Sequence, residues 1–511
     1  MMGQNEKNTI LKASFAVMLA TLLHRMLGFA REMTLAATYG AGSVSDAFVI
    51  AMSLPTVVLE LFTTSVSTLF IPQYTRADDQ KSRFTNNLIS ILAVIGLVFA
   101  IIFTVFPQAL TYLFAMKLSK ESFDMATQLL RVIVWSSVPI LLMAVLRGYL
   151  QVNRVFFIAT ALDSCVNVFI ICAMFLGKLS GYYIILGYGA ALGNYISLIL
   201  LFLISRRKGL RYKPVIDFND PNLRTMLVLM VPLVLAMSVR EINQIVDKNF
   251  ASSLVSGTIS ALNYSARINN VVAALLGTAI GTAMFPQISE YGASGEIDKL
   301  KNRAMKSVYT LIPLLLPLTA GMIILGLPVT RILLERGEFN AGNTAMTAQC
   351  LSMYSISLLS GNLIPLVTRA FYAMQKTKVP TIISAISLAV GIVLDLILMR
   401  FMAHRGLALA TSVSSIINCT ILFIVFKKTV GDLGFRKEAP ELIKVIAATV
   451  VMSGAVISGR MFTPVVGGTY MQTLLWTAVI AGGGAAVYGL LLLVMRAEIM
   501  MTVISRVRKR T

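Results

Sequence analysis

The chain has 511 residues, of which 57% are hydrophobic and only 13% are charged. Soluble domains carry about 25% charged residues, so this composition excludes an ordinary soluble protein and indicates a polytopic membrane protein. The net charge of +21 is spread among short loops. Because it forms no basic face, nucleic-acid binding is not expected.

Apolar runs of about 20 residues recur along the chain, and each is long enough to cross a hydrocarbon core of about 30 Å as a helix. The first run, from Ala13, meets Arg25 and Arg31 without a small-residue cleavage site, so we expect a spanning helix and not a cleaved signal peptide. The pattern predicts an all-α fold of fourteen transmembrane helices, at about 13–38, 44–72, 86–114, 122–150, 156–177, 183–205, 222–250, 258–288, 307–329, 342–372, 379–402, 406–426, 441–460 and 470–496.

Lys and Arg concentrate at both ends of the chain and in every second predicted loop. Cytoplasmic loops carry such an excess of basic residues, so both termini are expected in the cytoplasm. The basic segment 206–224 is interpreted as a solvated linker. The basic tail 506–510 is expected near anionic headgroups.

Short motifs recur in the same order at a nearly constant offset, which indicates an internal repeat. The pairs are Gly42–Ser45 with Gly257–Ser260, Lys81–Arg83 with Lys301–Arg303, and Arg147–Tyr149 with Arg369–Phe371. They predict two six-helix lobes of the same orientation, related by a pseudo-twofold axis along the membrane normal. The expected parts are an N-lobe at 1–213, a C-lobe at 214–428, and helices 13 and 14 with the tail at 429–511.

Several charged residues fall inside the apolar runs. A charge at the centre of a bilayer costs roughly 2.5–3.5 kcal/mol, so such residues face protein or a wet cavity and mark a pathway. Simple structural pairing across helix interfaces is the alternative explanation. The set comprises Arg25, Arg31, Arg131, Arg240, Lys248 and Arg267, with Glu32, Asp46, Glu60, Asp163, Glu241, Asp247 and Asp395.

Arg25 and Arg31 lie six residues apart, which separates them by about 120° around a helix and about 9 Å along it. They fit one broad cavity wall, and Arg267 would face the same cleft from the other lobe. Arginines converging on a buried cleft suit a phosphate-bearing substrate, because guanidinium stays charged and donates two parallel hydrogen bonds to phosphate oxygens.

No catalytic constellation accompanies these charges. The two histidines, His24 and His404, are far apart in the sequence, and the four cysteines lie in apolar segments without a CxxC motif. No P-loop or other nucleotide fingerprint is present. Transport is therefore favoured over an enzyme such as a polytopic glycosyltransferase.

The segments Arg25–Glu32 (RMLGFARE), Gly40–Gly42 and Ser45–Phe48 (SDAF) together resemble the helix 1 and 2 signature of the MurJ (MviN) lipid II flippase family. Leu334–Phe339 (LERGEF) and Asn263–Arg267 (NYSAR) resemble two further motifs of this family. The resemblance covers essentially the whole chain. It implies the fourteen-helix fold of the multidrug/oligosaccharidyl-lipid/polysaccharide exporter superfamily, with a lipid-facing groove at helices 13 and 14.

Carried over by resemblance, the substrate-binding residues are Arg25, Arg31, Glu32, Asp46 and Arg267. A further family arginine on helix 2 is replaced here, because Leu59 and Glu60 stand at its place. Some members of the family that this chain resembles are coupled to sodium. By resemblance, the sodium site would fall on Asp247, Asp395 and Thr411, although Gly391 stands where the family pattern has an Asn. Carboxylates and hydroxyls suit a hard cation, and coupling to protons or to membrane potential alone fits these residues almost as well.

The resemblance implies a lipid II flippase for peptidoglycan biosynthesis, working by alternating access in the cytoplasmic membrane. The expected partners are lipid II and the bilayer, with a monomeric chain, no nucleic acid and no cofactor other than a coupling Na⁺ or H⁺. A flippase for another polyprenyl-diphosphate oligosaccharide is the nearest alternative. A cation-coupled drug exporter is further off, since the arginines would repel a cationic drug.

Overall fold

The computed structural model describes residues 4–463, 468–498 and 500–501, with the side chains of 4–17, 79, 236, 239, 240 and 274–286 left undescribed. The described residues form helices and no strand. They group into two compact units, Met1–Ser260 and Ala261–Thr511. The predicted all-α membrane fold is therefore confirmed.

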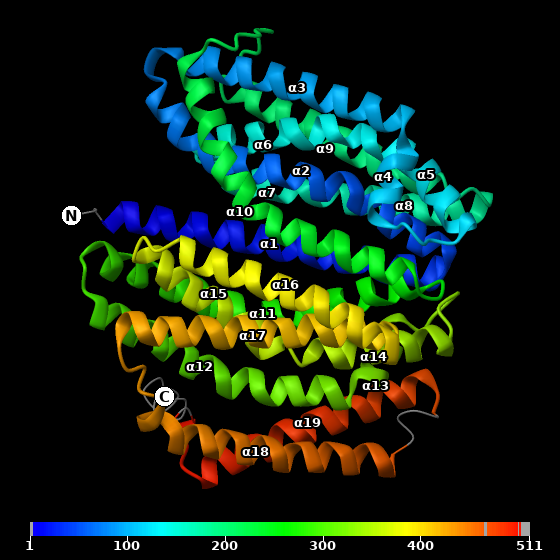
Figure 1. The fold of residues 1–511 in the computed structure, drawn as a ribbon, viewed down its shortest axis with the longest axis vertical. Helices are drawn as coiled ribbons and strands as arrows, with labels where there is room; N and C mark the ends of the chain where they lie inside the picture. Colours follow the sequence, from blue (N-terminus) through cyan, green and yellow to red (C-terminus); the bar gives the residue numbers. More distant parts are fainter. Residues whose placement is uncertain (1–3, 464–467, 499, 502–511) are drawn as a thin grey trace. The chain divides into compact units, whose positions relative to one another are not determined.

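The first unit holds ten helices among its described residues, with short 3-10 turns between some of them (Figure 1). Its core joins α2, α3 and α6 through buried residues such as Phe70, Phe84 and Leu146. The helices are α1 (Gln4–Tyr39), α2 (Ser43–Arg76), α3 (Lys81–Val105), α4 (Pro107–Phe114), α5 (Lys120–Ile133), α6 (Ser137–Val152), α7 (Phe156–Ala161), α8 (Cys165–Ser180), α9 (Ile185–Arg207) and α10 (Pro221–Ser252), with η1 (Asp78–Gln80), η2 (Val134–Ser136) and η3 (Leu162–Ser164).

The second unit contains α11 (Thr258–Ala293) from Ala261 onward and the helices that follow it. Its main core joins α12, α15 and α17 through buried residues such as Leu311, Phe371 and Phe426. The last two helices pack against each other, and α18 also packs against α12. The helices are α12 (Ile297–Ile324), α13 (Gly326–Leu334), α14 (Ala341–Ser355), α15 (Leu358–Ala373), α16 (Lys378–Met402), α17 (His404–Val430), α18 (Phe435–Phe462) and α19 (Tyr470–Val494).

Helix covers all fourteen predicted ranges, but several of them are interrupted. The range 86–114 breaks at Phe106, because the residue before a proline is pushed out of the helical region and Pro107 follows. The range 307–329 breaks at Leu325, and α14 and α15 meet at an angle of 42°.

Among the described residues, ten helices are long and apolar enough to cross a membrane, or eleven if the bent pair forms one span. The count of fourteen spans therefore stays a prediction. The predicted division at 213 and 428 also stays a prediction. The first compact unit extends to Ser260, because α10 packs against α2, α3 and α4.

The segment between α9 and α10 is more ordered than a solvated linker. Asn87 on α3 pairs with the backbone of Asp217 in both directions, at 2.7 and 2.8 Å, and Arg83 forms a 2.8 Å salt bridge with the Asp217 carboxylate. Asn86 donates to the Arg211 carbonyl at 3.1 Å. The basic side chains of this segment point outward, whereas its backbone is fastened to α3 because α3 begins with a polar turn.

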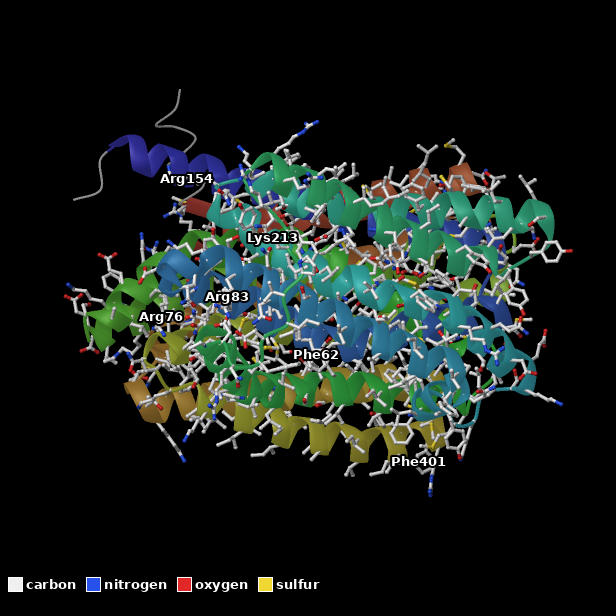
Figure 2. The ribbon with its side chains drawn as sticks, turned by 90° about the horizontal axis from the view of Figure 1, so that it is seen from above. Phe62, Arg76, Arg83, Arg154, Lys213 and Phe401 are labelled. Atoms are coloured by element: carbon white, nitrogen blue, oxygen red, sulfur yellow. The ribbon has the colours of Figure 1, made fainter. Side chains whose placement is uncertain are left out.

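The basic ends of several helices in the first unit gather at one end of the unit. Figure 2 shows Arg76, Arg83, Arg154 and Lys213 toward this end, and all four are exposed. The sequence places the same residues in loops on one predicted side of the membrane. These four residues, which were predicted to lie on the same side of the membrane, therefore lie at the same end of the first unit.

Candidate functional site

Arg31 lies in a buried polar network on α1. Its Nη2 donates to Glu32 Oε1 at 2.5 Å and its Nη1 donates to Asn167 Oδ1 on α8 at 3.2 Å. Glu32 and Asn167 are 4% and 3% exposed, while the Arg31 side chain is 16% exposed. Because α1 packs against α7 and α8, two of the five guanidinium donors are engaged inside the first unit.

Arg25 differs from Arg31 although both lie on α1. Its side chain is exposed, next to the exposed Met26, and it forms no ion pair with any described acidic residue. The six-residue spacing therefore separates an accessible arginine from one held by partners. The two share a helix, as predicted, but not a network.

Asp46 lies at a joint between chain segments far apart in the sequence. Its carboxylate accepts from the backbone N–H of Gly257 at 2.6 Å, and from the N–H and hydroxyl of Ser260 at 2.7 and 2.6 Å. These groups form the first turn of α11, where a carboxylate satisfies otherwise unpaired N–H groups and interacts favourably with the helix dipole. The geometry gives Asp46 a structural role, and its predicted contact with substrate stays a prediction.

Gly257 is required at this joint. It has φ of +90°, which favours glycine, and a Cβ there would lie 2.5 Å from the Ala41 carbonyl oxygen. On the other side, the Ser45 hydroxyl donates to the Gly40 carbonyl at 2.8 Å. The two turns that the repeat relates in sequence are therefore in contact.

Arg267 lies on α11 within the second unit, where its side chain is exposed and engaged in an interaction. Nearby, Tyr264 is buried and meets Phe339 edge-on, with ring centroids 5.8 Å apart. This contact joins the two second-half motifs of the resemblance, NYSAR and LERGEF. The LERGEF loop thus supports the helix that carries Arg267.

Two of the residues predicted to bind a cation, Asp247 and Thr411, bond to residues of their own helix. Asp247 on α10 accepts from Asn243 at 3.3 Å, and Thr411 donates to the Leu407 carbonyl at 3.1 Å. Asp395 is buried on α16, which packs against α17. No cluster of three His, Cys, Asp or Glu side chains suited to a metal occurs in the described ranges, and the sodium site stays a prediction.

The structure shows which way the side chains point at the helix 2 position where this sequence departs from the family pattern. Leu59 is 1% exposed and belongs to the core of the first unit, whereas Glu60 is exposed. An arginine at the Leu59 position would enter that core. Of the other membrane-depth charges, Asp163 pairs with Arg147 at 2.6 Å and Arg131 is exposed, while the side chain of Arg240 lies outside the described residues.

Asn167 was not predicted as a site residue, because a neutral amide in an apolar run carries no charge to count. Gly257 and Ser260 were predicted only as members of the repeat, although both donate hydrogen bonds to Asp46. The polar residues Asn167 and Ser260 interrupt apolar helices, which is the signal that would have indicated them.

The chain was compared with known proteins. The family model for lipid II flippase MurJ matches residues 35–476. A probable lipid II flippase MurJ from Vibrio cholerae is 28% identical over 504 residues, covering 95% of this chain and 96% of the relative. The corresponding protein of Rhizobium tropici is 27% identical over 455 residues, covering 86% and 85%.

Solved structures agree with the family match. A structure of lipid II flippase MurJ in an inward closed conformation has a TM-score of 0.80 at 25% identity, covering 96% of this chain and 99% of that one. An inward-facing MATE family transporter of the MOP superfamily shares the fold, with a TM-score of 0.66 at 13% identity over 80% of this chain and 95% of its own. The family model spans most of the sequence, and the chain therefore belongs to the lipid II flippase MurJ family.

Proposed function

We propose that this protein is a lipid II flippase, which moves the undecaprenyl-diphosphate-linked peptidoglycan precursor from the inner to the outer leaflet of the cytoplasmic membrane. The observation that carries the proposal is the family match over residues 35–476, supported by relatives aligned over almost their whole length. The protein is a multi-pass membrane protein of a transporter family. Its termini are proposed to be cytoplasmic and its working form a monomer.

In the proposed mechanism, arginines bind the diphosphate. Arg25 is accessible on α1, so its donors are available to an incoming anion. Arg31 is oriented by Glu32 and Asn167, which lowers the entropy lost when it binds phosphate through its remaining donors. Arg267 is proposed to contribute from the second unit.

The proposed cycle is alternating access, with the substrate cleft opening to one side of the membrane at a time. The bonds from Asp46 to Gly257 and Ser260 fasten the α1–α2 turn to the start of α11. A movement of the start of α2 away from the start of α11 would have to break these bonds. Coupling to Na⁺ through Asp247, Asp395 and Thr411, or to H⁺ or membrane potential, is proposed as the driving force.

The proposal is tested by expressing the full chain in a bacterial strain whose own flippase is depleted, with accumulated lipid II as the readout. Restored growth and loss of the accumulated lipid II are expected. Failure to rescue despite normal expression and membrane insertion would reject lipid II as the cargo. Rescue by Asp395→Asn with an unchanged sodium dependence would reject the proposed cation site.

A further inference from the structure

Helix α2 has an unusual accessible face for a membrane-spanning helix. It spans 34 residues and buries Leu54, Leu59 and Phe70 against its neighbours. None of its large apolar side chains is exposed, although every side chain from 43 to 76 is described. Its exposed residues are Thr56, Glu60, Ser67, Thr68, Pro72, Thr75 and Arg76.

The adjacent helix α3 shows what a lipid-facing surface looks like in the same unit. Its exposed side chains include Val94, Val98 and Ile101, which are 46%, 49% and 48% exposed. Hydrocarbon accepts such a surface, whereas polar side chains at membrane depth face protein or water-filled space. The accessible face of α2 is therefore a polar wall that lacks the large apolar side chains of a lipid contact.

Glu60 lies halfway along this wall. It is 17 residues from the start of α2, about 26 Å along a helix about 51 Å long. Phe62, two residues further on, marks this level in Figure 2, well removed from the basic end where Arg76 lies. Among the described side chains no Lys, Arg or His forms an ion pair with Glu60, so its carboxylate is available to an external cation.

The residues next to Glu60 indicate which kind of cation its carboxylate would bind. Thr56 and Thr64 lie one turn to either side on the same face, with Cβ atoms about 5–6 Å from that of Glu60. One carboxylate flanked by hydroxyl oxygens matches an ammonium group, which has three donors and no acceptor. A Ca²⁺ or Mg²⁺ site needs more oxygen ligands, and no cluster of three acidic, His or Cys residues is found in the described parts of the chain.

We propose that Glu60, with Thr56 and Thr64, binds a primary ammonium group on the headgroup of the transported lipid. This rests on the proposed function, because lipid II carries a peptide whose side-chain amine is cationic at neutral pH. The site has the opposite charge from the arginines assigned to the diphosphate. The headgroup would therefore be oriented along α2, with its anionic and cationic ends bound by different residues.

The test uses the purified full chain in lipid nanodiscs and two forms of lipid II, one with a free amine on the peptide and one with that amine acetylated. Wild-type protein is expected to bind the free-amine form about two- to fivefold more tightly, the range for a solvent-accessible ion pair. Glu60→Gln should abolish this preference, and Glu60→Asp should retain it. Glu121→Gln, which removes an exposed carboxylate from the first turn of α5, is the matched control and should also retain it.

Equal binding of the two forms by wild-type protein, or an unchanged preference in Glu60→Gln, would overturn the inference and leave the proposed function intact. Loss of binding to both forms in a well-folded Glu60→Gln protein would also overturn it, because the carboxylate would then act on something other than the amine. Wild-type protein that binds neither form would reject the proposed function, and this inference with it. A monodisperse elution profile for each variant separates these outcomes from misfolding.

Discussion

Glu32 and Asp46 are both buried carboxylates near the start of the chain, but the protein compensates their charge in different ways. Glu32 is paired with the Arg31 guanidinium, which also contacts Asn167. Asp46 pairs with no cation among the described residues and is held by two backbone N–H groups and a hydroxyl. The first arrangement uses side chains that can exchange partners, whereas the second uses the fixed end of a helix.

This difference suggests different roles for the two sites, with the Arg31–Glu32 pair suited to binding substrate and Asp46 suited to holding a helix. A guanidinium can turn toward a phosphate while its carboxylate partner still balances its charge. A carboxylate bonded to a helix N-terminus can only hold or release that helix. Variants at the two sites should therefore differ in the balance between lost stability and lost transport.

Asp46→Ala is expected to have the largest effect on stability. It leaves the N–H groups of Gly257 and Ser260 buried without their acceptor, and each such group costs about 1–3 kcal/mol. We expect roughly 4 kcal/mol of destabilisation, measured as a lower midpoint of thermal unfolding in detergent. Asp46→Asn, which keeps the shape and one carbonyl acceptor, should fall between this variant and wild type. An unchanged midpoint for Asp46→Ala would show that these bonds do not stabilise the structure.

Arg31→Ala should have the next largest effect, because it removes the guanidinium that pairs with the buried Glu32 carboxylate. Breaking a buried pair costs about 3–5 kcal/mol, and the partial exposure of Arg31 reduces this to about 2–3 kcal/mol. The double variant Arg31→Ala/Glu32→Gln should recover part of the lost thermal midpoint but none of the transport. Recovery of transport by the double variant would mean that Arg31 serves only to neutralise Glu32.

Gly257→Ala should destabilise by about 2 kcal/mol through backbone strain and the close approach to Ala41. Gly295→Ala is the matched control, since Gly295 also has positive φ, +73°, but a Cβ there meets nothing within 4 Å. The control should lose about 1 kcal/mol. Equal losses of thermal midpoint in the two variants would place the whole cost in the backbone conformation and none in the contact between turns.

Arg25→Ala should have the smallest effect on stability, within about 0.5 kcal/mol, because the side chain is exposed. Its rescue of a flippase-depleted strain should nevertheless be lost, because the proposed diphosphate contact is removed. Comparing the unfolding midpoint with rescue in the same variant distinguishes a substrate ligand from a structural residue. Full rescue by Arg25→Ala would remove this arginine from the proposed site.

Hydropathy alone was enough to place helix over every predicted range, since a membrane-spanning segment must satisfy its backbone hydrogen bonds internally. It did not predict the interruptions. The break at Phe106 was readable from Pro107, but the bend between α14 and α15 falls at Ile356 and Ser357, where no proline or glycine marks it.

The candidate site was predictable only for its charged members. Counting charges selected Arg31, Glu32 and Asp46, and Arg31 pairs with its sequence neighbour Glu32. The other partners of Arg31 and Asp46 are neutral residues more than 130 positions away. Such contacts depend on which helices pack together, and a single sequence does not specify that. The orientation of Leu59 into the core likewise needed the packing of α2 against α5 and α6.

The segment between α9 and α10 is held by hydrogen bonds at its start, its middle and its end. Its first residue is bound through the Lys208 carbonyl to Tyr149, its middle through Asp217 to Asn87, and its last residue, Asp220, caps α10. A flexible connection would let α10 slide or tilt while α3 and α6 stayed still. Here a displacement of the first turn of α10 would strain the bonds between the segment and α3, so a movement of α10 is expected to be transmitted to α3.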